Sequence, residues 1–286
     1  MSSQEWRRVY QAIRYVDKRV PKMGRKRPFY DDVLIVAMYV WAVWHDRPLC
    51  WASDRQNYTS VFRPRTLPSR SQFCRRIKTP RCQRILQGVH EQLARVDEPT
   101  DLSFLDGRAF PVGPYTSDPD AAKGWAGGGF AKGYKLHALA TKDGRITHFR
   151  VEPLNVNEKK VARILIDQAR PEGLLLADGE YDASALYDLV AEFGGQLFTP
   201  LPENAGQGHR RQSQARLKAV SLWRRHGERL YCQRSAIERF FSQLSSFGGG
   251  LAPLPAWVRT LSRVRRWIAT KLIIYHARIA IRRRAA

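Results

Sequence analysis

Gly173-Leu-Leu-Leu-Ala-Asp178-Gly is the stretch that decides the fold of this 286-residue chain. Its apolar run from Leu174 to Ala177 has no polar alternation, which is typical of a strand buried on both faces of a sheet. Asp178 follows where the run stops, and Gly179 lets the chain turn. Ligand sites of open α/β sheets lie beyond the carboxyl ends of such strands. The stretch therefore predicts a buried strand that ends on a carboxylate placed for chemistry.

Between residues 101 and 200 the sequence predicts strands that alternate with helices. The predicted strands cover 102–110, 133–141, 146–151, 173–177 and 196–200. The predicted helices cover 158–169, which Asn157 can cap, and 183–193. Residues 111–132 are rich in Gly, Pro, Ser and Asp and predict a loop. Strands that are joined by helical crossovers indicate an α/β fold, with a mixed sheet covered by helices on both faces.

The first hundred residues predict helices instead. Apolar residues recur every three or four positions over 6–16 and 30–44, and a basic linker with Pro and Gly, residues 18–28, joins the two segments. A further helix over 69–77 carries several arginines. It is either part of a helix-turn-helix unit that docks on DNA, or a packing module with solvated arginines.

The net charge of +23 is concentrated in two parts of the chain. Residues 1–100 carry 20 Lys and Arg against 9 acidic residues, and residues 201–286 carry 18 against 3. Residues 101–200 carry 11 against 14 and so keep their carboxylates. Basic surfaces of this size are typical of proteins that bind nucleic acid. The alternative is a basic protein without a polyanionic partner, and the acidic middle of the chain argues against it.

Several classes of protein are excluded by composition. The four cysteines show no CxxC spacing, and no histidine lies at ligand spacing with a cysteine, so neither a disulfide framework nor zinc is expected. The longest apolar stretch, residues 33–44, is too short to span a bilayer. The polar, charged start of the chain is unlike a signal peptide. We therefore expect a cytoplasmic protein with free thiols and no membrane partner.

Glu238 is one of only three acidic residues after position 200. It falls in a predicted helix, residues 231–244, whose apolar positions form a buried stripe. At about 100° per residue, Tyr231, Arg234 and Glu238 share a strip beside that stripe. One interpretation is a surface ion pair between Arg234 and Glu238, worth a few tenths of a kcal/mol. The other is that Glu238 points along the sheet toward the remaining carboxylates.

Asp106 lies in the first predicted strand, Asp178 ends the fourth and Glu238 lies on a late predicted helix. These three carboxylates can therefore converge in space. Three clustered carboxylates repel one another unless a cation offsets their charge. Oxygen ligands without His or Cys favour Mg²⁺, with Mn²⁺ as a substitute. Two such ions, about 3.5–4 Å apart, stabilise the attacking and leaving oxygens of an in-line phosphoryl transfer. The sequence thus predicts a metal-dependent phosphoryl-transfer site with DNA as substrate.

Four segments carry a resemblance to a known family. They are Phe104-Leu-Asp106-Gly, Lys132-Gly-Tyr-Lys-Leu-His137, Leu175-Leu-Ala-Asp178-Gly-Glu-Tyr-Asp182 and Arg234-Ser-Ala-Ile-Glu238-Arg-Phe-Phe. Together they resemble the catalytic half of a DDE-type insertion-sequence transposase. The resemblance covers roughly residues 100–280 and implies a ribonuclease-H-like catalytic domain, which we place over 101–286 with basic C-terminal helices. The helical pattern and basic charge of residues 1–100 predict a helical DNA-binding region. The resemblance also assigns Asp106, Asp178 and Glu238 as catalytic residues and metal ligands.

Related enzymes continue with a tyrosine, an arginine, the glutamate and a lysine, separated by two, three and six residues. Tyr231, Arg234 and Glu238 fit this spacing, whereas Ser245 stands where the lysine is expected. Tyr231 and Arg234 are therefore predicted to contact DNA. The phosphate contact of that lysine is expected either to be weakened or to be taken over by Arg239 or Lys271.

The resemblance implies an enzyme that cleaves double-stranded DNA at transposon inverted repeats and joins the freed 3′-hydroxyl to target DNA. It also implies a homodimer on paired ends, associated with a bacterial nucleoid. Two alternatives remain open at this point. One is a catalytically inactive DNA-binding protein of the same fold, and the other is a stand-alone metal-dependent nuclease.

Overall fold

The computed structural model describes residues 2–22, 28–96, 100–201, 213–251 and 253–285. Parts of the predicted linker and of the basic segment after residue 201 lie outside these ranges. The chain forms two compact units, one of Met1–Arg95 with Leu244–Ala286, and the other of Val96–Gln243. The first unit therefore combines residues from both basic flanks. The predicted functional division at residue 100 stays a prediction.

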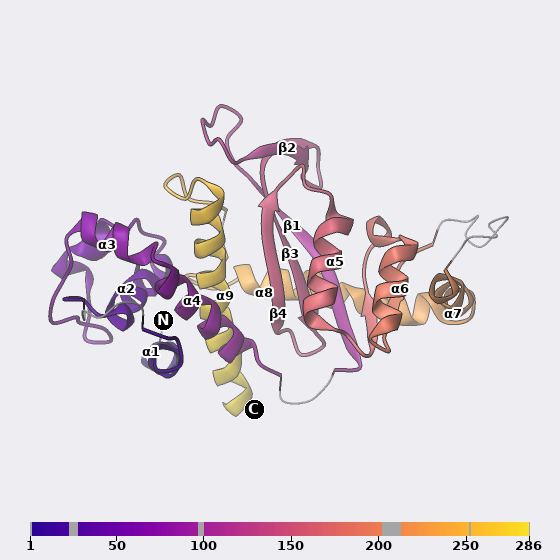
Figure 1. The fold of residues 1–286 in the computed structure, drawn as a ribbon, viewed down its shortest axis with the longest axis horizontal. Helices are drawn as coiled ribbons and strands as arrows, with labels where there is room; N and C mark the ends of the chain where they lie inside the picture. Colours follow the sequence, from indigo (N-terminus) through magenta and orange to yellow (C-terminus); the bar gives the residue numbers. More distant parts are fainter. Residues whose placement is uncertain (1, 23–27, 97–99, 202–212, 252, 286) are drawn as a thin grey trace. The chain divides into compact units, whose positions relative to one another are not determined.

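Figure 1 labels the helices and strands along the chain. The helices are α1 (Ser3–Asp17), α2 (Asp32–Trp44), α3 (Arg70–Ile77), α4 (Pro80–Ala94), α5 (Glu158–Ala169), α6 (Ser184–Glu192), α7 (Gln214–Tyr231), α8 (Ser235–Ser245) and α9 (Leu261–Ala285). The strands are β1 (Leu102–Pro111), β2 (Ala122–Trp125), β3 (Phe130–Thr141), β4 (Ile146–Pro153), β5 (Leu174–Leu176) and β6 (Gln196–Phe198). Short 3-10 turns are η1 (Trp51–Ser53), η2 (Arg55–Asn57), η3 (Gly179–Tyr181) and η4 (Cys232–Arg234). None of the described helices is both long and apolar enough to cross a lipid bilayer.

The second unit is built on one mixed sheet. Its main strand order is β4-β3-β1-β5-β6, in which β1, β3 and β4 are antiparallel and β5 and β6 run parallel to β1. The short strand β2 pairs with the start of β3. This is the ribonuclease-H-like mixed α/β sheet flanked by helices that the sequence predicts. Because β1 and β5 are parallel neighbours, residues at their carboxyl ends lie next to one another.

Helices cover both faces of this sheet. Leu105 and Leu139 pack into a core with α5 and α6, which lie side by side over the sheet in Figure 1. On the other face, the rings of Phe104 and Phe240 meet edge to face, with centroids 5.9 Å apart. Alternation along β1 thus directs Leu105 toward α5 and α6, and Phe104 toward α8. Asp106 follows Phe104 by two residues and shares its face.

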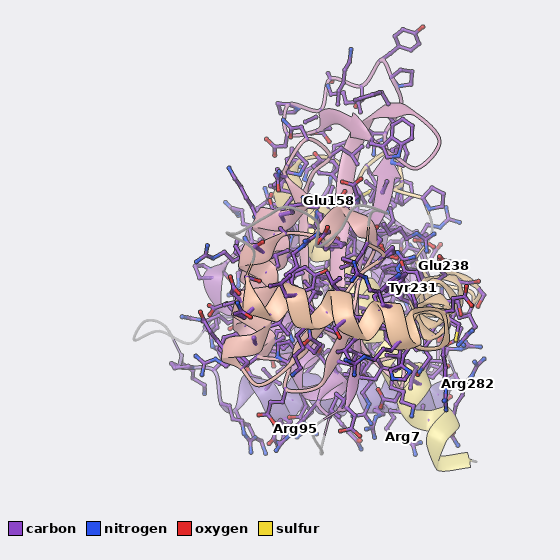
Figure 2. The ribbon with its side chains drawn as sticks, turned by 90° about the vertical axis from the view of Figure 1, so that its right-hand side faces the viewer. Arg7, Arg95, Glu158, Tyr231, Glu238 and Arg282 are labelled. Atoms are coloured by element: carbon purple, nitrogen blue, oxygen red, sulfur yellow. The ribbon has the colours of Figure 1, made fainter. Side chains whose placement is uncertain are left out.

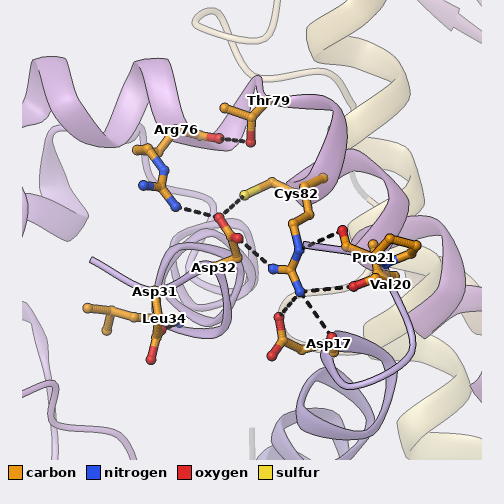
Figure 3. Close-up of polar contacts among 10 residues, drawn as sticks. Asp17, Val20, Pro21, Asp31, Asp32, Leu34, Arg76, Thr79 and Cys82 are labelled. Atoms are coloured by element: carbon orange, nitrogen blue, oxygen red, sulfur yellow. Dashed lines mark hydrogen bonds and ion pairs between the residues drawn. The ribbon is translucent and has the colours of Figure 1, made fainter. Parts of the chain in front are cut away.

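In the first unit, α1, α2, α3, α4 and α9 pack around a hydrophobic core. The N-terminal ends of α2 and α4 are joined by a half-buried ion-pair network around Asp32, shown in Figure 3. The Asp32 carboxylate accepts hydrogen bonds from Arg76 Nη2 and Arg81 Nη1, each at 2.5 Å. Arg81 also pairs with Asp17 at 2.7 Å. The network ties four segments of the unit together.

Three local expectations differ from the structure. The segment 111–132 contains β2, which forms a hairpin with β3 through a turn in which Gly127 has φ +83°. The basic stretch before Tyr231 forms α7, a helix that the sequence analysis did not predict. The helix predicted over 231–244 is divided, because Tyr231 ends α7, η4 follows as a 3-10 turn, and α8 begins at Ser235.

Candidate active site

The parallel pairing of β1 and β5 brings two of the predicted acids together. Asp106 lies within β1, on the face covered by α8, and Asp178 comes two residues after the end of β5. The Asp178 side chain caps η3 by accepting a hydrogen bond from the backbone N–H of Glu180 at 3.0 Å. The Asp106 carboxylate accepts one from the backbone N–H of Gly107 at 2.7 Å. Both carboxylates are therefore oriented by backbone donors.

Arg234 connects these two acids to the third. Its Nη2 lies 3.2 Å from Asp106 Oδ2 and 3.7 Å from Asp178 Oδ2, and its Nη1 lies 3.6 Å from Glu238 Oε1. The three carboxylates therefore converge on one guanidinium. Glu238 thus makes an ion pair with Arg234, but that pair belongs to a larger cluster and is not isolated on the surface.

The junction of α7 and α8 determines how these side chains are presented. The 3-10 turn η4 carries Arg234 between the two helices, and Glu238 lies one turn into α8. The Arg234 guanidinium carbon is 5.9 Å from the centre of the Tyr231 ring, within the range of a cation–π contact. Tyr231 and Glu238 lie close together in Figure 2, and both interact electrostatically with Arg234. The structure thus brings together five predicted site residues, which are Asp106, Asp178, Tyr231, Arg234 and Glu238.

The electrostatics of the site differ from one acid to the next. Burial raises the pKa of Asp106 to about 6, even though Arg234 lowers it. Burial also raises the pKa of Asp178, again against the lowering effect of Arg234. The side chain of Asp106 is 14% exposed, whereas that of Glu238 is 67% exposed. The cluster is therefore most closed at Asp106, half-buried at Asp178 and open to solvent at Glu238.

A second group of polar side chains, which the sequence pattern did not predict, acts on the aspartates. Glu158, in the first turn of α5, forms an ion pair with Lys135 Nζ from β3. Tyr181 donates a hydrogen bond to the other Glu158 oxygen at 3.2 Å. Lys135 and Glu158 both act electrostatically on Asp178. Lys135 lies in one of the four segments that carry the family resemblance. The signal for Glu158 was its position at the start of the predicted helix, which is equally typical of an ordinary helix start.

The two residues predicted to replace the missing lysine differ in placement. Arg239 is exposed on α8, and its Nη1 donates a hydrogen bond to Ser235 Oγ at 3.1 Å. Lys271 belongs to the first unit, where its side chain is fully buried. Its Nζ lies 2.7 Å from Asp46 Oδ1 and donates to the Gly249 carbonyl at 2.9 Å. In this arrangement, Lys271 is an internal ion-pair partner and is not accessible to a phosphate.

The chemistry of the three carboxylates fits hard divalent cations, because every donor is an anionic oxygen. Among the described residues, no group of three Asp, Glu, His or Cys side chains is arranged so that it could hold a metal ion as it stands. Instead, the positive charge among Asp106, Asp178 and Glu238 is that of Arg234. A divalent cation at these oxygens therefore requires the guanidinium to move aside.

The fold and the acid cluster together define a ribonuclease-H-like domain of the DDE class. Residues 97–276 match the family model described as the transposase DDE domain, and the chain belongs to this family. Comparison with curated proteins gives no match. Among solved structures, a piggyBac transposase synaptic complex with hairpin DNA is similar, with a TM-score of 0.48 and 9% identity over 96% of this chain and 71% of that one. The assignment to DNA transposases rests on the family match, and this family generally uses divalent metal ions.

Proposed function

We propose that this transposase cleaves DNA at transposon ends and joins the freed 3′-hydroxyl to target DNA, with Asp106, Asp178 and Glu238 as ligands of two Mg²⁺ ions. Mn²⁺ would substitute for Mg²⁺. The observation that carries the proposal is the convergence of the three carboxylates on Arg234, since acids from two strands and a helix have no need to meet for stability alone. When bound, the ions would lower the pKa of an attacking water and offset charge on the phosphate.

The residues of the acid cluster and those beside it have separate roles in holding the metal ions and the DNA. Asp106 and Asp178, held by backbone N–H groups, provide fixed anionic ligands, and Glu238 completes the set from the solvent side. The planar guanidinium of Arg234 suits phosphate as well as carboxylate, so it is placed to bind a DNA phosphate beside the acids. Tyr231 and the exposed Arg239 extend this contact along the DNA backbone.

The DNA partners in this proposal are the inverted repeats at the ends of the element and the target duplex. Residues 1–100 would serve as the helical DNA-binding region, consistent with their basic composition. Two ends must be held together for transposition, so the proposal includes a homodimer on paired ends. It also places the protein in the bacterial cytoplasm, at the nucleoid.

The test is a cleavage reaction of the full chain on linear DNA that carries an element end and its flanking sequence, with Mg²⁺ present or chelated. Asp106→Asn, Asp178→Asn and Glu238→Gln should each lower the cleavage rate by at least about a hundredfold, because each removes a ligand from the reacting centre. The matched control is Asp188→Asn, at an exposed position of α6, which should cleave at the rate of the unmodified protein.

Products separate the proposal from its two alternatives. Joints between the 3′ end and a second duplex support a transposase, whereas hydrolysis without joints indicates a stand-alone nuclease. Binding without Mg²⁺-dependent cleavage indicates an inactive DNA-binding protein, an outcome for which Ser245 in place of the lysine is the structural reason. Cleavage at the normal rate by any of the three carboxylate variants contradicts the role assigned to that residue.

A further inference from the structure

The first unit contains a cavity of about 170 Å³ that the acid cluster does not explain. It is lined by residues of α2, α3 and the start of α9, together with the segments around residues 47–50 and 257–258. The volume is below the range of roughly 300–1,000 Å³ that is typical of pockets for drug-sized ligands. The cavity is therefore suited to one ring or one small group.

Positive charge surrounds this cavity. Its lining includes Arg47, Arg70, Lys78, Arg263 and Arg266, and among the described residues that line it there is no acidic side chain. All except Arg266 are exposed. A ring of cations without carboxylates to neutralise it favours an anionic ligand.

Arg266 and Trp267 also line the cavity. Within the described part of the chain, Arg266 Nε and Trp267 Nε1 are both buried and have no hydrogen-bond partner. Arg266 forms a side-chain hydrogen bond with Tyr39, and Trp267 is only 2% exposed. Because these two nitrogen atoms have almost no accessible surface, the preference for an anion rests on the exposed cations around them.

Aromatic surface is the third property of the cavity. Trp257 lines it and keeps 41% of its surface exposed, an unusual degree of exposure for tryptophan. Indole faces stack on nucleobases, and arginine guanidinium groups add cation–π attraction to such stacks. The exposed indole and the volume of a single ring suit the base of one nucleotide, and the surrounding cations suit its phosphate.

We propose that this cavity binds an unpaired nucleotide, with its base stacked on Trp257 and its phosphate held by Arg263 and neighbouring cations. A base in a DNA duplex is stacked and cannot enter, so the ligand is a single-stranded or extruded nucleotide. This site is independent of the acid cluster and of the metal-dependent chemistry proposed for it. The same ligand chemistry could be presented by DNA or by a free nucleotide.

The experiment measures binding of a fluorescein-labelled oligothymidylate to the full chain by anisotropy, at several salt concentrations, with EDTA to prevent cleavage. Trp257→Ala should weaken binding by about fivefold to a hundredfold without changing the salt dependence, because a stacking contact carries no charge. Trp257→Phe, which keeps an aromatic face, should restore most of the affinity. Arg263→Ala should weaken binding and also lower the slope of log K against log salt by about 0.7.

Arg282→Ala is the matched control, because Arg282 is exposed on α9, belongs to the same unit and does not line the cavity. It should bind within about twofold of the unmodified protein. Equal losses for Arg282→Ala and Arg263→Ala, or unchanged binding by Trp257→Ala, would overturn the proposal. A thermal melt of each variant separates loss of binding from loss of folding.

Two further arms identify the source of the nucleotide. Cys74 lines the cavity and is half-buried, so its rate of reaction with a thiol reagent reports occupancy. Protection of Cys74 by the oligonucleotide but not by thymidine monophosphate assigns the site to DNA. Protection by the free nucleotide at low concentration assigns it to a small ligand, and inorganic phosphate tests for an anion site that needs no base. Protection by phosphate alone, or no protection by any of these probes, contradicts the proposal.

Discussion

Replacing Asp106 by Asn should abolish cleavage and at the same time stabilise the fold near pH 7. Burial raises the pKa of Asp106 to about 6 from an ordinary value of 3.8. One pKa unit corresponds to about 1.4 kcal/mol, so keeping this carboxylate ionised costs about 3 kcal/mol. Asn has the same shape and no charge to desolvate. The raised pKa already includes the attraction of Arg234, at 3.2 Å, so we expect a net gain of up to about 3 kcal/mol.

The sign of the pH dependence follows from the direction of the shift. The folded protein holds its proton more tightly than the unfolded chain, so Asp106 imposes no penalty below about pH 4. The penalty grows as the pH rises from about 4 to about 6 and is complete above that. Asp106→Asn should therefore differ little from the unmodified protein near pH 4 and exceed it in stability near pH 7.

Urea denaturation in the presence of EDTA, at pH values across this range, measures the effect. The difference in free energy of unfolding between Asp106→Asn and the unmodified protein should rise with pH. Mg²⁺ should then raise the stability of the unmodified protein and leave that of Asp106→Asn nearly unchanged, since the variant lacks a ligand. A variant that is less stable near pH 7, or a difference that does not vary with pH, would refute this account of the site.

Three further predictions concern other parts of the chain. Asp32→Asn should destabilise the protein by about 3 kcal/mol near pH 7 in the same denaturation assay, because it removes the carboxylate that pairs with both Arg76 and the buried Arg81 and leaves Arg81 with Asp17 alone. Burial alone would raise the pKa of Asp32, but the hydrogen bonds from Arg76 and Arg81 outweigh burial and lower the pKa below its ordinary value of 3.8. The loss of stability in Asp32→Asn should therefore shrink as the pH falls below about 4, and a loss that does not vary with pH would contradict this role of Asp32. Gly173→Ala should lower the melting temperature, since a Cβ there would clash with the Asp101 carbonyl, while Gly113→Ala, with open space around it, should not. Ser245→Lys should steepen the salt dependence of duplex binding by about 0.9, and an unchanged slope would mean that position 245 does not reach a phosphate.

Local periodicity was sufficient to predict the sheet. The apolar run before Asp178 is β5, and the helix predicted over residues 158–169 is α5 with the same bounds. The predicted strand over 102–110 is β1, whose alternation places Phe104 and Asp106 on one face, as their contacts with Phe240 and Arg234 show. These features follow from neighbouring residues, which the sequence presents directly.

Features that depend on distant partners could not be predicted in this way. The strand β2 is only four residues long and owes its conformation to pairing with β3. The helix α7 has few buried residues and therefore shows little apolar periodicity. Arg234 was expected to pair with Glu238 alone or to contact DNA, whereas it also meets Asp106 and Asp178 through the packing of α8 on the sheet. Lys271 is buried because Asp46, far away in the sequence, supplies its counter-charge.

The most direct test of the central claim is a crystal of the full chain soaked in Mn²⁺ and measured at a wavelength where manganese scatters anomalously. We expect anomalous density among the Asp106, Asp178 and Glu238 carboxylates, with the Arg234 guanidinium displaced from its present contacts. Manganese bound elsewhere, with Arg234 still between the three acids under saturating Mn²⁺, would contradict that claim.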